Sequence, residues 1–578
     1  MCTIMKLAKL EITGYHRHCH TTILFGDATF LIGENNVGKS SILNAIDLLL
    51  SNKQKLEDSD YYAILNNSLE PCHNSVLEII GEFIDIPEEA DNWKFFKGLI
   101  IEDQNPLNVQ ENVRKIIIKK TYEIGKEVVI EQRSYKMALK PQFEECKTIQ
   151  DYLDAGLDIT ETIQGRPLTY KLTSKDKDKV LLEYRECLYD LDNSELEWFK
   201  NPGGFFGNIS CRLPKYIVIP AQSKVNELDS DKGTLNSTLQ EIFTEISCDS
   251  PTYQKALENL REFQEEINPD NPDSPMAQMI GEINSTVSNV FLNSTLNISS
   301  DLQSDGSIKP KFTVTMKSNI ETSVENQGTG LIRSAIFALL RYKNIRDSKK
   351  QSSGTYVRPL IIGFEEPEIY LHPTAAVKMR EQIYSLSSSE FNQIVCTTHS
   401  PYMIDLSNKE NQVLNKLWTE DSIVNINGTD FTTDIVKSCA FNIGTAYKSI
   451  LDDEKSYVKM LLKMDDSVTK VFFVENALIV EGDTESVVLQ KTLQLLPERY
   501  YRDIQFSWQI VRARGKAAII PLVKYLKAMN IKIKVIHDLD LNTEGAKIFN
   551  QPILDAVQDQ KKVYGLVNWI EYNKVCNL

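Results

Sequence analysis

Residues 31–41, with the sequence LIGENNVGKSS, constrain this chain more than any other segment. An apolar, strand-like stretch precedes them, and a stretch with the pattern of a helix follows. Gly33 and Gly38 lie five residues apart and are followed directly by Lys39 and Ser40, which is the spacing of a loop that surrounds phosphate groups. Backbone N–H groups and the helix N-terminus would face the phosphate oxygens. The segment therefore predicts an α/β nucleotide-binding domain.

The chemistry of this loop suggests a role for each polar side chain. Lys39 would reach the β and γ phosphates of a nucleotide, and the Ser40 hydroxyl would be a ligand of Mg²⁺. We assign the neighbouring Asn35, Asn36 and Ser41 to the same nucleotide site. The rest of the chain must then supply the residues that complete the site.

Two later segments have the residues that such a site needs. Residues 358–373 read RPLIIGFEEPEIYLHP, an apolar strand that runs into Glu365 and Glu366. One carboxylate can join the Mg²⁺ ligands, and the other can orient or deprotonate the attacking water. Residues 393–401 form another apolar strand, and its end carries His399, which can contact the γ phosphate. We therefore expect these two strands to be parallel neighbours of the first.

Composition limits the classes of protein to which the chain can belong. Its 578 residues predict two or three domains, and its 42% hydrophobic residues are those of an ordinary globular protein. We expect a cytoplasmic protein without a membrane anchor, because no apolar stretch is long enough to span a bilayer. The net charge of −16 argues against bulk electrostatic coating of nucleic acid. It does not exclude a nuclease, since carboxylate-rich metal sites are themselves acidic.

Outside these motifs, the chain reads as strands and then helices. Alternating residues predict strands at 7–12 and 21–25, and a β-hairpin within 115–136. The turn between the first two strands carries three histidines and a cysteine, but the second half of a zinc motif is missing, so we expect a strand connection there. Residues 233–297 have helical spacing and predict either a module that holds two subunits together or a helical core within one chain.

The last hundred residues contain a second group of acids. A strand within 471–485 ends in Glu481, with Glu485 one helical turn beyond, and a strand at 531–536 is followed by Asp538 and Asp540. Carboxylates at the ends of parallel strands converge at one edge of a sheet. Four oxygen ligands of this kind suit Mg²⁺ or Mn²⁺ at a phosphodiester.

GENNVGKSS, FEEPEIYLHP and TTHSP together resemble the Walker A, Walker B and H-loop motifs of the ABC-type ATPases allied to the SMC proteins. Residues 326–334 lie where that family has its signature helix, so the resemblance assigns Gly328 and Gly330 to the nucleotide. It also implies a homodimer, because the signature helix of one subunit closes on the phosphates bound by another. The first Walker B acid is Glu365 instead of Asp, which leaves open whether Glu365 or Glu366 contacts Mg²⁺.

The second acidic group is similar to the Glu and D-x-D motifs of the Toprim domain. An ABC ATPase followed by a Toprim domain resembles the OLD (overcoming lysogenization defect) family, which includes the Gabija-type nuclease and retron-associated effectors. Members of this family usually have further acidic and basic residues after D-x-D. Candidates for these residues are Glu571, Lys547, Lys561, Lys562 and Lys574.

The resemblance implies an ATP-regulated, divalent-metal-dependent DNA endonuclease that acts on double-stranded DNA in defence against phages. Its catalytic residues would be Glu366 at the ATPase site and Glu481, Asp538 and Asp540 at the Toprim site. Its partner would be a companion helicase, or a reverse transcriptase with its RNA–DNA product. Two alternatives are an SMC-like sensor whose Toprim domain binds nucleic acid without cutting it, and a primase-like nucleotidyl transferase.

We therefore predict an α/β protein with an ABC/SMC-like P-loop ATPase, a helical insertion and a C-terminal Toprim domain. The expected boundaries are 1–230 for the first part of the ATPase, 231–300 for the helical insertion, 301–465 for the second part of the ATPase, and 470–578 for the Toprim domain.

Overall fold

The computed structural model of the chain separates into two compact units, Met1–Ala221 with Gly354–Leu578, and Gln222–Ser353. The structure describes residues 4–65, 71–93, 99–200, 212–221, 357–369, 371–405, 411–426, 428–442, 471–474, 476–528, 531–540 and 542–557, with isolated residues between these ranges. In the second unit it describes one antiparallel pair, β12 (Thr315–Lys317) with β13 (Glu321–Ser323). Most of the predicted helical insertion and all of the signature-like segment at 326–334 lie outside the described residues.

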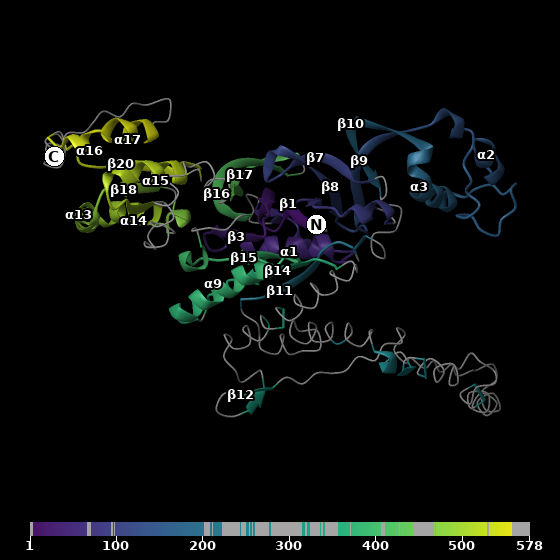
Figure 1. Cartoon of the computed structure of the whole chain (residues 1–578), viewed down its shortest axis with the longest axis horizontal. Helices are drawn as coiled ribbons and strands as arrows, with labels where there is room; N and C mark the ends of the chain where they lie inside the picture. The colour runs from purple at the N-terminus through teal and green to yellow at the C-terminus, as the bar shows by residue number, and fades with distance from the viewer. Residues whose placement is uncertain are drawn as a thin grey trace. The chain divides into compact units, whose positions relative to one another are not determined.

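The first sheet is antiparallel and contains the strands expected at the N-terminus (Figure 1). Its order is β10-β9-β8-β6-β1-β2, and β7 pairs with β8. The predicted hairpin is confirmed, because Thr121 lies opposite Val129 across a short turn. The bounds are β1 (Lys6–Tyr15), β2 (His18–Leu24), β6 (Val76–Ile84), β7 (Ile101–Asn105), β8 (Asn108–Glu123), β9 (Val129–Leu139) and β10 (Tyr189–Lys200).

The second sheet carries the three segments that the sequence motifs single out. Its order is β11-β14-β15-β3-β16-β17, in which the first five strands are parallel and β17 is antiparallel to β16. Its central strands are continuous apolar runs because both faces are covered. The bounds are β3 (Ala28–Gly33), β11 (Lys215–Ile219), β14 (Leu360–Glu365), β15 (Asn392–Thr397), β16 (Gln412–Ile426) and β17 (Thr429–Asn442).

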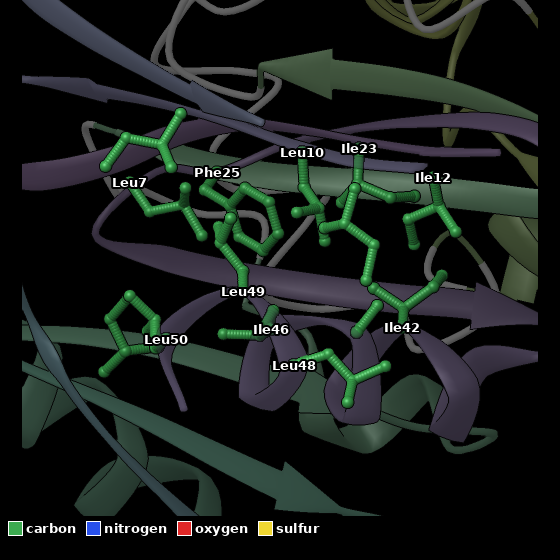
Figure 2. Packing of buried hydrophobic residues seen from close by; sticks show 14 of the residues in the cluster. Leu7, Leu10, Ile12, Ile23, Phe25, Ile42, Ile46, Leu48, Leu49 and Leu50 are labelled. Atoms are coloured by element: carbon green, nitrogen blue, oxygen red, sulfur yellow. The ribbon is translucent and has the colours of Figure 1, made fainter. Parts of the chain in front are cut away.

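Helix α1 (Lys39–Leu50) lies between these two sheets, since it contacts β1 and β6 of the first and β3, β11 and β15 of the second. This position explains why the helix is apolar on nearly all sides. Figure 2 shows Ile42, Ile46 and Leu49 of the helix facing Leu10 and Ile23 of the first sheet. Each such side chain stabilises the fold by about 1.5–3 kcal/mol when fully buried.

The last turn of α1 is closed by a buried lysine from the first sheet. Lys120 of β8 is fully buried, and its Nζ donates hydrogen bonds to the carbonyl oxygens of Leu48 at 3.0 Å and Ser51 at 2.6 Å. A cation at this position satisfies carbonyls that have no partner within the helix and interacts favourably with the helix dipole. Burial lowers the pKa of Lys120 to about 7, against the opposing effect of Asp47.

A smaller body with its own core lies in the chain between β9 and β10 of the first sheet. Helices α2 (Ile149–Asp154) and α3 (Ser174–Leu188) enclose an apolar cluster that includes Phe143, Ile159 and Val180. Thr148 begins α2, and its hydroxyl accepts a hydrogen bond from the backbone N–H of Asp151. This body thus contains one short helix of 6 residues and one longer helix of 15 residues.

The C-terminal body has a parallel sheet of three strands in the order β19-β18-β20. Helix α15 contacts β18 and β20, and α13 contacts β19. The two strands predicted within 471–485 and at 531–536 are confirmed as β18 and β20. The bounds are β18 (Asn476–Val480), α13 (Asp483–Gln494), α14 (Glu498–Ser507), β19 (Trp508–Arg512), α15 (Lys516–Ala528), β20 (Lys532–Ile536), α16 (Glu544–Lys547) and α17 (Asn550–Val557).

Within the part of the chain that the structure describes, we find no helix with the length and apolar character that crossing a membrane requires.

Candidate functional site

The loop between β3 and α1 has the backbone conformation of a phosphate-binding loop. Gly33 and Gly38 have φ values of 154° and 97°, and Asn36 between them has 63°. A Cβ atom at Gly38 would lie 2.6 Å from Nε2 of His18, so this position requires glycine for two reasons. Asn35 and Asn36 are exposed at the loop surface, as contacts to a bound nucleotide would require. Successive N–H groups in such a loop form a concave site for an anion.

Lys39 lies across this loop and is almost completely buried. Its Nζ donates to the carbonyl oxygens of Gly33 at 3.1 Å and Glu34 at 2.7 Å. Burial lowers the pKa of Lys39 to about 8, while the carboxylates of Glu366, Glu368 and Glu34 act in the opposite direction. The ammonium group is therefore held at the mouth of the loop by neutral acceptors, which a phosphate can replace.

Glu365 at the end of β14 faces the first hydroxyl of α1. The Ser40 Oγ donates a short hydrogen bond to Oε1 of Glu365, and the backbone N–H of Ala221 donates to Oε2 at 3.3 Å. The adjacent Glu366 has no such contact with Ser40 among the described hydrogen bonds. Of the two glutamates left open by the sequence, Glu365 is thus the one beside the serine that would bind Mg²⁺.

Glu366 faces the histidine at the end of the neighbouring strand. Its backbone has φ 40°, and its N–H donates to Thr397 O at 3.0 Å and Thr397 Oγ1 at 3.1 Å. This fixes a conformation in which Oε1 of Glu366 lies 3.3 Å from Nε2 of His399. The pKa of His399 is lowered mainly by burial and then by Lys39, against the effect of Glu366.

A third glutamate of the same motif, Glu368, completes this arrangement and was not predicted. Its Oε1 accepts hydrogen bonds from the Thr398 hydroxyl at 2.5 Å and from the N–H groups of His399 at 3.0 Å and Ser400 at 3.2 Å. Burial raises its pKa. Glu368 thereby holds the loop that presents His399. The repeated acid in EEPE is the only sequence signal for it.

The second loop hydroxyl of α1, Ser41, has a partner from the first sheet. Nδ1 of His16 lies 3.0 Å from Ser41 Oγ, and Nε2 of the same ring lies 3.3 Å from Asp60. Gly328 and Gly330, assigned by resemblance to the nucleotide, lie outside the described residues.

The second acidic group lies at the carboxyl edge of the C-terminal sheet. Val480 and Ile536 are paired at the ends of β18 and β20, so the chains that follow them begin side by side. Oε2 of Glu481 accepts a hydrogen bond from the backbone N–H of Asp538 at 3.3 Å. The carboxylate of Glu485 instead accepts from the N–H of Gly482 at 2.9 Å and so caps its own helix, α13.

Lys516, at the start of α15, lies among these acids and was not predicted. The lysine is buried, and its Nζ donates to the backbone oxygen of Asp538 and, at 3.0 Å, to Oδ2 of Asp540. Asp540 has φ 48°, a conformation that this ion pair stabilises. The signal in the sequence is a Gly-Lys pair directly after the second strand, at the same edge of the sheet as the acids.

The donor atoms at this edge are carboxylate oxygens, which suit Mg²⁺ or Mn²⁺ in kind. However, no three Asp, Glu, His or Cys side chains among the described residues gather closely enough to form a metal cluster. Glu481 and Asp538 are brought together, whereas Asp540 is bound by Lys516 and Glu485 by its helix. Of the later candidates, Lys547 is exposed on α16, and Glu571, Lys561, Lys562 and Lys574 lie outside the described residues.

Comparisons with known proteins agree with this division of the chain. Residues 5–404 match the family described as AAA ATPase domain, and residues 472–540 match the family described as overcoming lysogenization defect protein-like, TOPRIM domain. These matches confirm the predicted order of an ATPase followed by a Toprim domain.

Similar individual proteins include two nucleases. The Old nuclease of Escherichia phage P2 is 25% identical over 548 residues, which are 93% of this chain and 77% of that protein. Endonuclease GajA of Bacillus cereus (strain VD045) is 22% identical over 323 residues, 51% of this chain and 48% of that protein. A solved SMC head bound to the C-winged helix domain of ScpA covers 76% of this chain and 99% of its own, with 14% identity and a TM-score of 0.34.

Proposed function

This chain belongs to the AAA ATPase domain family and, through its Toprim domain, to the OLD family of ATPase-linked nucleases, and on that premise we propose that it is an ATP-regulated, divalent-metal-dependent endonuclease of double-stranded DNA. ATPase and nuclease activity both follow from its family membership. The metal, the regulation by ATP and the DNA substrate are our proposals.

The observation that carries the proposal is the pairing of Glu481 with Asp538. Two strands of the C-terminal sheet deliver these acids to the same edge, and a hydrogen bond joins the carboxylate of one to the backbone of the other. A divalent ion bound here would activate a water molecule and stabilise the leaving oxygen of a phosphodiester. Glu481, Asp538 and Asp540 would hold the ion, with Glu485 as a further ligand once it leaves the helix end.

At the nucleotide site, the contacts support a role for each residue. Ser40 and Glu365 would hold Mg²⁺, which fits their direct hydrogen bond, and Lys39 would neutralise the β and γ phosphates. Glu366 would orient the attacking water, and His399, held beside it, would contact the γ phosphate. Gly328 and Gly330 of a second copy would close the site, so the active form would be a homodimer or a higher homo-oligomer.

We assign regulation from the order of the domains. ATP binding and hydrolysis would change the arrangement of the ATPase dimer and thereby the access of DNA to the Toprim acids. We further propose that it acts in defence against phages in the cytoplasm. The similarity to endonuclease GajA supports its action as an endonuclease. A companion helicase, as in Gabija, or a reverse transcriptase with its RNA–DNA product would then be the partner.

Cleavage of supercoiled plasmid in Mg²⁺ or Mn²⁺, with and without ATP, tests the proposal. Asp538→Ala and Glu481→Ala should each lower the rate of cutting by at least ~100-fold, because each removes a metal ligand. Both variants should still hydrolyse ATP, which shows that they are folded. Equal cutting by the wild type and both variants would refute the assignment of the metal site.

One observation favours a second candidate function. Asp540 is bound to Lys516, so the described acids do not form a closed metal cluster. The chain could then be a sensor that binds nucleic acid through its Toprim domain without cutting it. In that case the wild type would retain DNA in a binding assay and would leave the plasmid intact at every concentration of Mn²⁺.

A further inference from the structure

The turn between β1 and β2, residues 16 and 17, and the first residue of β2, His18, lie against the phosphate-binding loop. His16, Arg17 and His18 each contact a different part of it, namely the Ser41 hydroxyl, the Asn36 carbonyl and the Gly38 carbonyl. The strands pair up to Tyr15 and His18, so the turn has only two residues and little freedom.

His18 is fully buried and has one partner on each ring nitrogen. Its Nε2 lies 3.0 Å from the carbonyl oxygen of Gly38, and its Nδ1 lies 3.0 Å from Oγ1 of Thr21. A carbonyl can only accept, so Nε2 carries the hydrogen, and Nδ1 accepts from the threonine hydroxyl. Burial lowers the pKa of His18 to about 4, so the ring keeps this neutral form at neutral pH.

The bond to Gly38 fixes the direction of one N–H group in the loop. A peptide unit is planar and trans, so its C=O and N–H point in opposite directions. The carbonyl of Gly38 points toward His18, and the N–H in the same peptide unit belongs to Lys39. That N–H must therefore point away from His18. The backbone N–H of Ile42 also donates to this carbonyl, but at 3.3 Å, so His18 has the shorter contact.

Arg17 has the same effect on a second peptide unit. Its guanidinium donates to the carbonyl of Asn36 at 2.6 Å and to the carboxylate of Asp434 on β17 at 3.0 Å. The N–H in that peptide unit belongs to Val37. Asn36 has a φ of 63°, which an L-residue adopts at a cost, so an external bond helps to hold it.

From these contacts we propose that Arg17 and His18 are positioning residues of the ATPase, which hold two carbonyls of the phosphate-binding loop outward so that the N–H groups of Val37 and Lys39 face the nucleotide phosphates. Position 38 must then be glycine for two reasons: its φ is positive, and the His18 ring occupies the space that a Cβ atom at position 38 would need. The inference concerns nucleotide binding and does not depend on the proposed DNA cleavage.

The direct test is the affinity of the whole chain for AMP-PNP with Mg²⁺, measured by calorimetry. His18→Leu replaces the ring with an apolar side chain, and we expect the dissociation constant to rise about tenfold. His18→Gln keeps an N–H donor of similar reach and should restore most of the affinity. His20→Leu is the matched control, because His20 contacts Thr13 on the same hairpin, and it should bind like the wild type.

Two further variants keep the test decisive if His18→Leu does not fold. Arg17→Met changes a partly exposed side chain, and Thr21→Val removes the hydroxyl that orients the His18 ring; each should weaken AMP-PNP binding by about two- to fivefold. In steady-state ATP hydrolysis, KM should rise more than kcat falls. A folded His18→Leu protein with unchanged affinity, or unchanged affinity in both other variants, would overturn the proposal.

Discussion

The two acidic sites of this chain are built alike and differ in what their buried lysine contacts. Each has carboxylates at the ends of parallel strands and a lysine at the start of the following or neighbouring helix. Among the described residues, Lys39 donates to the backbone carbonyls of Gly33 and Glu34 and to no carboxylate, which leaves Glu365 for Ser40 and Glu366 for His399. Lys516 donates directly to Asp540, a proposed metal ligand.

This difference separates a site that is ready for its ligand from one that is held by an internal cation. At the first site the acids already face the groups with which they would act. At the second, the positive charge that neutralises Asp540 comes from the protein. A divalent ion there would have to share Asp540 with Lys516 or displace the lysine.

Glu366→Gln should have the largest effect, because it removes the carboxylate that would orient water while it keeps the shape of the side chain. We expect kcat for ATP hydrolysis to fall by at least ~100-fold, with little change in the dissociation constant for AMP-PNP. Glu365→Gln is the matched comparison. It removes the carboxylate beside Ser40, so it should weaken the Mg²⁺-dependent binding of AMP-PNP in addition to slowing hydrolysis. Normal hydrolysis by Glu366→Gln would show that the first site is not arranged as we describe.

Lys516→Met tests the internal cation of the second site. A unit charge within hydrogen-bonding distance of a ligand contributes at least about 1 kcal/mol, so its removal should lower the dissociation constant for Mn²⁺ by about tenfold. The measurement is a titration with Mn²⁺ in the absence of nucleotide. Lys491→Met, which removes an exposed lysine of α13 in the same body, should bind Mn²⁺ like the wild type. Weaker binding by Lys516→Met would instead make the lysine an organiser of the site.

Glu368→Ala should have a smaller effect, through the loop that presents His399. Three donors from Thr398, His399 and Ser400 lose their acceptor, and we expect kcat for ATP hydrolysis to fall about fivefold to tenfold. Glu368→Gln retains one carbonyl oxygen and should keep most of the activity. If alanine and glutamine lower kcat equally, the hydrogen bonds are not the cause.

Lys120→Met should have the smallest effect, a change in the pH dependence of stability. The pKa of Lys120 is about 7 in the folded protein and starts from 10.5 in the absence of burial, so between these values the unfolded chain binds more protons. Stability from this group therefore rises with pH over that window. Between pH 7 and pH 9, the melting temperature of the wild type should rise relative to that of Lys120→Met. Parallel curves would contradict the lowered pKa.

The fold could be predicted from sequence because its signals are local. The strand before Gly33, the acids after 360–364 and the three strands of the C-terminal sheet each follow from apolar patterns and turn residues close in the chain. The ATPase–Toprim order and the α/β class are confirmed by the matching families. The functions of the individual site residues remain predictions. The signature segment and most of the helical insertion lie outside the described residues.

The residues that were missed act through contacts between segments distant in sequence. Lys516 meets Asp540 across the edge of a sheet, and the His18 side chain meets Gly38 only when the first sheet lies over α1. Three histidines in one turn raise the question of zinc, but each ring contacts a different partner: Ser41, Gly38 or Thr13. Sequence spacing carries no information about such partners.

The central claim is that the two sites perform separate chemistry and can be disabled separately. The most direct measurement is ATP hydrolysis and plasmid cleavage assayed on the same preparations of Asp538→Ala and Glu366→Gln. We predict that Asp538→Ala hydrolyses ATP and does not cut DNA, and that Glu366→Gln fails to hydrolyse ATP and cuts DNA with an altered response to nucleotide. Undiminished cutting by Asp538→Ala would contradict the account.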